Sequence, residues 1–439
     1  MSKLPANPSS YYTEHIKQVQ LVSNVFDGID SASMYLQQYT QEDITEFKDR
    51  KSIATLDNFV FRTVEDIQNI IFRKPIDTDG ITNRTVLDYC NKIDFTNNLN
   101  EFGKQILRNR LRDGFTFILV DSVSYGEDEQ LTLADQQALD IRPYFVNVLR
   151  KNVIGWKKNK AGRYTQVRIK ETYEEEDGYD IVEKEQIKVW NIGSVEIWRG
   201  AELYELIETG LSIIPIVKVG SDDIPPLYDL AKINITHMNR DSEVSNYARV
   251  GGAAFLAVFG AEVQEGEVQT VGISDGMQFS DKTVSDVKWI EMEGRNYNML
   301  KDRLLYHEEQ MKRIAISFTT SQENKTATQV NKESLTDESK AVDYATELED
   351  GLNTALDMLN NYKIEGATFG ENTILVNKDF DSNVLTPEQV TSYRTDYASG
   401  IISFEELRDL LAKGEYLKEI TEAEMQKIKT QIKDDVDQV

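Results

Sequence analysis

The sequence of 439 residues predicts an α+β protein with several structural units. Three observations point to this class. Residues 1 to about 140 carry apolar side chains mostly at three- and four-residue spacing, which predicts helices. From Arg142 to Val219 the apolar period changes to two, which predicts strands. Between Pro225 and Tyr362 the chain then reads as a helix, a short β-rich segment, a second helix, a polar loop and a long helix.

The N-terminal part predicts helices followed by one strand. The helical stretches are Tyr11–Tyr39, Gln41–Lys51, Asn58–Phe72 and Asp94–Arg112. The short apolar run Phe115–Asp121 is typical of a buried strand. The strands predicted next form an antiparallel set: Tyr144–Leu149, Tyr164–Tyr173, Ile181–Trp190, Val195–Trp198 and Ile213–Val219. The acidic residues 174–178 fit a solvated hairpin tip better than a ligand cluster.

The segment from 225 to 362 predicts two helices joined through a β-rich insert. The helices cover about 227–249 and 296–317, and the insert covers 253–292. Each helix has an apolar face too narrow for a core helix of one globule, so we expect equivalent helices of neighbouring copies to complete the burial. A polar loop at 318–325 leads into a helix from about 327 to 362, which would be ~54 Å long if unbroken. Gly351 is a position where this helix could bend.

The C-terminal part predicts one strand, Thr373–Asn377, and three helices with capping boxes. These begin at Thr386, Ser403 and Thr421, each followed three residues later by Glu or Gln. Pro387 would take the first helical position of the first of them.

The composition is acidic, with a net charge of −26. This argues against a protein that binds nucleic acid tightly, because tight binding requires Lys and Arg side chains that neutralise the phosphates. A well-solvated acidic surface explains the charge, and so does a channel wall along which DNA must slide. The one cysteine, Cys90, excludes an intrachain disulfide and fits a buried, inert thiol. No apolar run approaches a membrane span, and Met1–Pro8 lacks the apolar core of a signal peptide.

Motifs for catalysis are weak. Gly272-Ile-Ser-Asp-Gly276 satisfies the G-x-S-x-G pattern of a hydrolase nucleophile, but an ordinary turn explains it better. Asp77-Thr-Asp-Gly80 lacks the first and last ligands of a calcium loop. The three histidines have no metal-ligand spacing, and no phosphate-binding G-x-x-x-x-G-K-[ST] is present. We therefore expect no enzyme activity, no metal and no cofactor.

The helix–β–helix–loop–long helix order resembles the stem, clip, tunnel loop and crown-bearing helix of tailed-bacteriophage portal proteins. The Thr326-Ala-Thr-Gln329 stretch after the loop is similar to the segment that opens the long helix in that family. The resemblance implies a ring-forming subunit with these parts: an N-terminal arm and α/β wing (1–222), a first stem helix (223–250), a clip (251–294), a second stem helix (295–317), a tunnel loop (318–326), a long wing-to-crown helix (327–365) and a crown with C-terminal tail (366–439).

The same resemblance implies a function in the virion, at the portal vertex of the capsid, after assembly in the host cytoplasm. A ring of usually twelve copies would let double-stranded DNA pass during packaging and ejection. Its partners would be the large terminase subunit, a head-completion or adaptor protein, and the major capsid and scaffolding proteins, without a membrane.

Three groups of residues are candidates for contacts in such a ring. The tunnel-loop candidates for DNA contact are Thr319, Thr320, Ser321, Gln322, Asn324 and Lys325. The channel-lining candidates of the stem are Asp241, Glu243, Glu308 and Glu309. The clip candidates for partner docking are Glu262, Glu265 and Glu267. Two alternatives stay open: another oligomeric phage structural protein without a DNA pore, or a hydrolase that uses Ser274.

Overall fold

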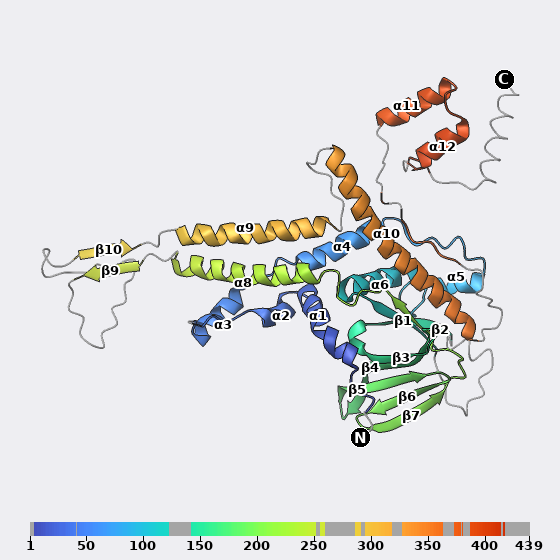
Figure 1. The fold of residues 1–439 in the computed structure, drawn as a ribbon, viewed down its shortest axis with the longest axis horizontal. Coiled ribbons are helices and arrows are strands. Elements are labelled where there is room, and N and C mark those ends of the chain that lie inside the picture. Colours follow the sequence, from blue (N-terminus) through green and yellow to red (C-terminus); the bar gives the residue numbers. More distant parts are fainter. Residues whose placement is uncertain are drawn as a thin grey trace. The chain divides into compact units, whose positions relative to one another are not determined.

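The structure is a computed structural model (Figure 1). It describes residues 4–40, 42–122, 142–251, 255–259, 286–290, 295–317, 327–362, 373–378, 380, 387–413 and 416–417. Contacts divide the chain into two compact units, Met1–Lys378 and Asp379–Val439. Helices and strands are both abundant, which confirms the predicted α+β class.

Six helices and a 3-10 turn form the N-terminal part. They are α1 (Ser10–Phe26), α2 (Ile29–Ala32), η1 (Ser33–Tyr35), α3 (Ile44–Ile53), α4 (Phe59–Ile71), α5 (Arg84–Cys90) and α6 (Leu99–Asp113). A continuous helical stretch from Tyr11 to Tyr39 is wrong, because the chain leaves the helix after Phe26 and Gly28 takes a φ of +104°. The helix predicted from Asp94 begins only at Leu99, where the Asn98 side chain caps it.

The strands form two separate sheets rather than one antiparallel set. The first sheet has the order β2 (Pro143–Val148), β1 (Thr116–Ser122) and β8 (Ile216–Val219), all antiparallel. The second is a five-stranded antiparallel meander of β3 (Val153–Lys158), β4 (Tyr164–Asp177), β5 (Asp180–Asn191), β6 (Ser194–Arg199) and β7 (Glu202–Glu208). The 3-10 turn η2 (Arg150–Asn152) leads into β3. The sequence did not predict β3 and β7, because their apolar residues stand next to each other instead of alternating with polar ones.

One core cluster of the first unit lies between these two sheets. Its buried residues come from β1, β2 and β8 on one side and from β3 to β6 on the other. Phe115, Phe117 and Trp190 contribute the largest side chains, and Trp156 packs on them at the edge. The burial of apolar surface is the dominant favourable contribution to the folding of the first unit.

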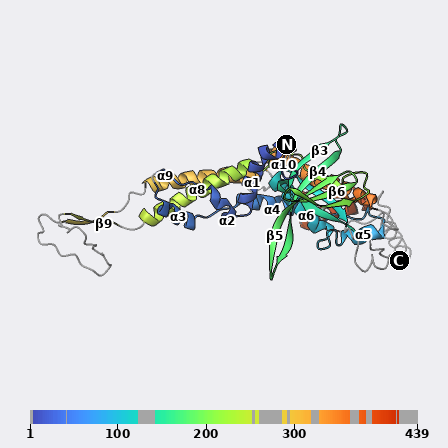
Figure 2. The same cartoon turned by 90° about the horizontal axis from the view of Figure 1, so that it is seen from below.

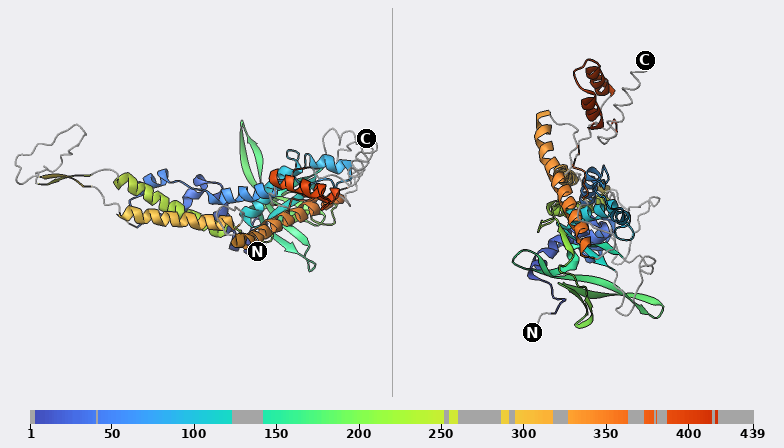
Figure 3. Two further views of the ribbon diagram at one scale, coloured as in Figure 1. Left: turned by 90° about the horizontal axis from the view of Figure 1, so that it is seen from above. Right: turned by 90° about the vertical axis from the view of Figure 1, so that its right-hand side faces the viewer.

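Two helices and a hairpin follow the sheets. Helix α8 (Tyr228–Gly251) and helix α9 (Arg295–Ile316) run side by side, as Figures 1 and 3 show. In the chain between them, β9 (Phe255–Phe259) pairs antiparallel with β10 (Asp286–Ile290). Helix α10 (Ala327–Met358) comes next and ends in the 3-10 turn η3 (Leu359–Asn361). The predicted order of helix, β-segment, helix and long helix is therefore confirmed.

Helix α10 packs against β1, β8, α4 and α6 with the apolar stripe that its sequence predicts. The buried members are Ala345, Leu348, Leu352, Ala355, Leu356 and Leu359. Gly351 lies on this face, and a Cβ atom there would come within 2.6 Å of Val219 Cγ2 on β8. The glycine therefore allows a close approach of helix and sheet, a role that the sequence does not reveal.

The second unit contains α11 (Pro387–Ala398) and α12 (Phe404–Lys413), with Val390, Leu407 and Leu411 in its core. The predicted capping box of α12 is confirmed: the Glu406 backbone N–H donates to Ser403 Oγ, and the Ser403 N–H donates to the Glu406 carboxylate. Pro387 is the first residue of α11, as predicted. Thr421 lies outside the described residues. In place of the strand predicted at 373–377, the structure has one isolated bridge within the first unit, between Leu375 and Asp77.

Candidate functional site

The candidate site is the pair of helices α8 and α9, which the resemblance to portal proteins implies to be a stem. Helix α8 is not the exposed rod that its narrow apolar face predicts. Leu230, Ala231 and Met238 are fully buried, because α1, α3 and α4 of the same chain pack against α8. The prediction that this helix needs neighbouring copies for its burial is wrong: its polar side chains bind other parts of the same chain.

Two of the four predicted channel carboxylates accept hydrogen bonds from residues 36–55, which we call the N-terminal segment. The Thr55 hydroxyl donates to Asp241 Oδ2 at 2.5 Å. Glu243 accepts hydrogen bonds from the Tyr39 hydroxyl and, at 2.8 Å, from the Arg240 guanidinium. Both carboxylates are half-buried. Each therefore has a structural role within the single chain, whether or not it also lines a channel.

The other two carboxylates lie on α9. Glu308 is turned towards α8, with its Oε1 atom 3.7 Å from His237 Nε2, and its other oxygen is 3.6 Å from Lys312 Nζ. Glu309 is exposed. Of the four predicted channel residues, Glu309 is thus the one whose carboxylate faces solvent freely in the single chain.

The exposed charges of α9 are mostly basic, which differs from the acidic channel wall that the net charge suggests. Among residues 297–316 of this helix they are Lys301, Asp302, Arg303, Glu309, Lys312 and Arg313, four basic and two acidic residues. Three large apolar side chains are exposed among them: Met299 (64% exposed), Leu305 (47%) and Tyr306 (47%). A helix face that mixes charge with large apolar groups in this way is typical of a surface that a partner covers.

Two histidines are enclosed between the helices. His237 of α8 is 5% exposed and His307 of α9 is 8% exposed. Within the described residues, both ring nitrogens of His237 lack a hydrogen bond. The same holds for Nδ1 of His307. Burial lowers the pKa of His307, and the positive charges of Arg303 and Arg240 lower it further, whereas a hydrogen bond with Gln310 raises it. The ring is therefore neutral at neutral pH.

A buried arginine fastens the N-terminal segment to α8. Arg50 of α3 is 1% exposed and donates through Nε and Nη2 to both carboxylate oxygens of Glu42, at 2.6 and 2.8 Å. Its Nη1 donates to Ser242 Oγ at 2.8 Å and its Nη2 to the Gln37 carbonyl at 2.6 Å. These hydrogen bonds lower the pKa of the Glu42 carboxyl. We call Arg50, Glu42 and Ser242 the arginine lock.

Two asparagines of α8 complete this attachment. The Asn234 side chain is fully buried, accepts from the Phe59 backbone N–H at 3.0 Å, and donates to the Asp57 carbonyl at 2.9 Å. Asn239 accepts from the Gln37 N–H at 3.0 Å and donates to the Tyr35 carbonyl at 3.2 Å. Both therefore satisfy backbone groups of the chain between the end of η1 and the start of α4, including the N–H of Phe59, the first residue of α4.

The arginine lock and the asparagine contacts were not predicted from the sequence. One signal was available: three polar residues, Asn234, Asn239 and Ser242, stand among the apolar positions of α8 on the side that is buried. Buried polar side chains require partners. The sequence cannot say which of its many charged residues those partners are.

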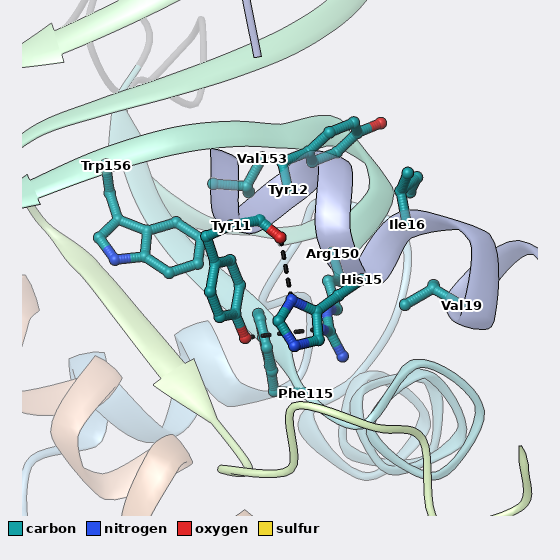
Figure 4. A pocket seen from close by; sticks show the side chains of 9 residues that line it. All are labelled: Tyr11, Tyr12, His15, Ile16, Val19, Phe115, Arg150, Val153 and Trp156. Carbon is teal, nitrogen blue, oxygen red and sulfur yellow. Dashed lines mark hydrogen bonds between the residues drawn. The ribbon is translucent and has the colours of Figure 1, made fainter. Parts of the chain in front are cut away.

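A small pocket lies elsewhere, between the N-terminus of α1 and the strand β3 (Figure 4). Its cavity of about 10 Å³ has room for roughly one water molecule. Arg150 donates to the Asp113 carbonyl at 2.6 Å and to the Asp223 carbonyl at 2.7 Å, and its guanidinium stacks on the Phe115 ring, 4.1 Å from the centroid. Tyr11 and Trp156 close the cluster. It anchors α1 to the body and is too small for a ligand.

Other kinds of site find no support in the described part of the chain. There, no group of three or more His, Cys, Asp or Glu side chains could hold a metal ion. The same residues include no helix that is long and apolar enough to cross a membrane. Cys90 is buried, as predicted. Ser274, the tunnel-loop candidates Thr319 to Lys325 and the clip candidates Glu262, Glu265 and Glu267 lie outside the described residues.

Comparison with known proteins gives a family match and several similar structures. A family described as "Domain of unknown function (DUF4055)" matches residues 226–363, from the start of α8 to just beyond η3. Comparison with curated protein sequences gives no match. A chain in the structure "Neck of empty GTA particle computed with C6 symmetry" is 15% identical, over 81% of this chain and 89% of that chain, with a TM-score of 0.42. A chain in "Neck of native GTA particle computed with C12 symmetry" is 15% identical, over 80% and 89%, with a TM-score of 0.41.

Proposed function

We propose that this chain is a portal protein, a subunit of a ring through which DNA enters and leaves a phage capsid. The observation that carries the proposal is the succession α8, β9–β10 hairpin, α9 and α10. Two long antiparallel helices that carry a β-tip, followed by a longer helix packed into the α/β body, have the order of stem, clip and crown-bearing helix in that family. The division of the chain into arm, wing, stem, clip, tunnel loop and crown is part of the proposal.

The exposed face of α9 gives a physical reason for ring formation. Helix α8 is covered on one side by the N-terminal helices and on another by α9. On α9, the described part of the chain leaves Met299, Leu305 and Tyr306 exposed. Covering these side chains would remove their apolar surface from water. Each Å² that is buried stabilises the assembly by about 25 cal/mol. In a ring, the stem of the next subunit would provide the cover.

The charges of α9 suggest how DNA would be handled. Lys301, Arg303, Lys312 and Arg313 can each contact a phosphate, whereas Glu309 repels one. A few such contacts along a largely acidic protein would hold DNA weakly and would weaken further with salt. Residues Thr319 to Lys325 would add contacts without sequence preference. The terminase, the adaptor, and the capsid and scaffolding proteins would dock on the outside of the ring, with Glu262, Glu265 and Glu267 as clip residues for basic partners.

Electron microscopy of the purified full-length chain tests the proposal. We expect closed rings with an axial pore wide enough for duplex DNA. Deletion of Ser321–Lys325 should leave these rings intact but reduce the retention of packaged DNA. Closed or open assemblies without a pore would instead favour a phage structural protein of another kind. Loss of rings on deletion of the loop would assign the loop a role in assembly.

The hydrolase alternative has a simple test of its own. Hydrolysis of an ester substrate by the purified chain, abolished by Ser274→Ala, would contradict the proposal of a purely structural protein. We expect no hydrolysis above the rate of the Ser274→Ala variant.

A further inference from the structure

The five-stranded sheet ends in two hairpin tips of opposite charge. The acidic tip is the outer part of the β4–β5 hairpin, Glu174–Glu185, with seven acidic side chains and one basic one, a net charge of −6. The basic tip is the β3–β4 turn, Lys157–Arg163, with four basic side chains and no acidic one, a net charge of +4. All the residues of the basic tip are exposed.

The acidic tip extends beyond the sheet as a two-stranded ribbon. Strand β3 pairs with β4 up to Ile169, and β6 pairs with β5 from Ile187 onward. Among the described strands, residues 170–177 and 180–186 therefore pair only with each other. An isolated two-stranded ribbon is marginally stable in water. Such a long one in a folded protein calls for a partner.

The register of the ribbon sets like charges against each other. Glu174 lies directly opposite Glu183, whereas Glu175 and Glu185 form ion pairs with Lys184 and Lys170. Like charges in directly opposed positions of an antiparallel pair destabilise it. Glu176 pairs with Ile181, which is 65% exposed, and the turn residue Tyr179 is fully exposed. The ribbon thus presents an acidic face with exposed apolar groups, and a basic partner would relieve its repulsion.

The two tips cannot meet within one chain. They are joined by β4, so they lie at opposite ends of one strand of 14 residues, roughly 45 Å apart at 3.3 Å per residue. Figure 2 shows the β4–β5 hairpin and the β3–β4 turn projecting from opposite sides of the sheet, and Figure 3 shows the same from above. A cyclic ring needs two different, mutually complementary patches on each subunit. The two tips meet this requirement.

We infer that the acidic tip of one copy docks on the basic tip of the next copy, in a head-to-tail contact. The inference rests on the proposed function in so far as that function requires a ring of copies. It adds which surfaces join them: Glu174, Glu176 and Glu183 of one subunit face Lys157, Lys160 and Arg163 of its neighbour. Because the pairs are exposed at the rim, salt weakens the contact.

Charge reversal at each tip tests the contact. One variant carries Glu174→Lys, Glu176→Lys and Glu183→Lys, and a second carries Lys157→Glu, Lys160→Glu and Arg163→Glu. Mass photometry at equal protein concentration measures the fraction of chains in rings, and circular dichroism checks that each variant is folded. We expect each variant alone to lose at least tenfold in ring fraction. The matched control, Lys17→Glu with Lys48→Glu and Lys51→Glu, changes exposed lysines of α1 and α3 and should assemble normally.

Mixing provides the decisive measurement. In an equimolar mixture, the reversed acidic tip of the first variant meets the reversed basic tip of the second, and their unchanged tips also match. We therefore expect rings to return in the mixture. A single chain that carries all six changes, with the net charge of the natural chain, should also form rings alone.

The outcomes separate this inference from the proposed function. Rings that form equally well with either variant alone, or a mixture that stays unassembled while the control assembles, overturn the tip contact but leave the portal function standing. Assemblies that depend on the tips but lack an axial pore overturn the portal function alone. A natural chain that stays monomeric at every concentration overturns both.

Discussion

At the residue scale, the arginine lock decides how the N-terminal segment is held. Helix α3 is exposed along nearly its whole length, and Arg50 is its one buried residue. Removing one partner of a buried ion pair leaves the other without compensation, which typically costs 3–5 kcal/mol. The lock is thus the main attachment of α3 to α8.

We expect Arg50→Met to lower the free energy of unfolding by about 3 kcal/mol, measured by urea denaturation. Hydrogen exchange should rise first in residues 36–54, because their attachment to α8 is lost. Arg62→Met is the matched control, since Arg62 and Asp57 form an exposed pair worth at most ~1 kcal/mol. Equal effects of the two substitutions would show that the lock contributes nothing special.

The buried thiol gives a second prediction at this scale. Burial raises the pKa of Cys90 to about 12, and the thiolate is the reactive form. We expect the native chain at pH 8 to react with a disulfide reagent at least 100-fold more slowly than the chain in urea. Above pH 9 an unfolded thiol loses its proton while the folded one keeps it, so the free energy of unfolding should fall as the pH rises further. Rapid labelling of the native chain would contradict this.

His307 gives a pH effect of the opposite direction. Its pKa is lowered in the folded state, so the unfolded chain binds the proton first as the pH falls below about 6.5. Stability should therefore be complete at pH 7.5 and decline below 6.5, with a slope from this group of at most ~1.4 kcal/mol per pH unit. His307→Phe should remove part of that slope. An unchanged slope would place the titrating group elsewhere.

At the element scale, the sequence predicts those features of helices and strands that depend on residues close together in the chain. The capping box at Ser403 and the first turn at Pro387 depend on residues within three positions of one another, and both are confirmed. The start of α6 was missed because Asp94, a good cap by type, instead accepts hydrogen bonds from the N–H groups of Thr96 and Asn97 in a turn. Which of two nearby capping residues is used depends on the surrounding packing.

The role of Gly351 could not be predicted for the same reason. Its partner, Val219, is more than a hundred residues away in the sequence, on β8. A glycine inside a helix suggests a bend, but here it makes room for a side chain. Helix α8 shows the same limit: its apolar spacing predicts the helix, while the elements that bury it are α1, α3 and α4.

Gly351→Ala should therefore destabilise the first unit, although alanine favours a helix by up to ~1 kcal/mol over glycine. Overpacking of a core typically costs 1–3 kcal/mol, and we expect a net loss of about 1–2 kcal/mol in urea denaturation. Val219→Ala in the same chain should restore most of the loss, with a coupling that a double-mutant cycle measures. A stabilised Gly351→Ala variant would rule out the close approach as the reason for the glycine.

At the scale of the whole molecule, the four carboxylates predicted to line a channel are not equivalent probes of the proposed DNA channel. Asp241, Glu243 and Glu308 have partners inside the chain, so their replacement by lysine would disturb folding as well as charge. Glu309 is exposed and carries no such complication. The sequence analysis could not separate the four, because all are acidic residues of predicted stem helices.

We expect Glu309→Lys to change the free energy of unfolding by less than about 0.5 kcal/mol, as measured by thermal denaturation. In rings, it should slow DNA packaging, because it adds twelve basic groups, if twelve copies assemble, that can bind phosphate. The effect should shrink as salt is raised. Glu405→Lys on α12, also an exposed acidic position, serves as the control for charge alone.

The length of β4 has a consequence for the dimensions of the assembly. If subunits join end to end through the two ends of this strand, each copy contributes roughly 45 Å of arc. Twelve copies would then close a circle with a circumference of ~540 Å and a diameter of ~170 Å at the level of the sheet. Lengthening β4 and β5 by two residues each should widen that circle by about 25 Å, a change that class averages of end-on particles can resolve.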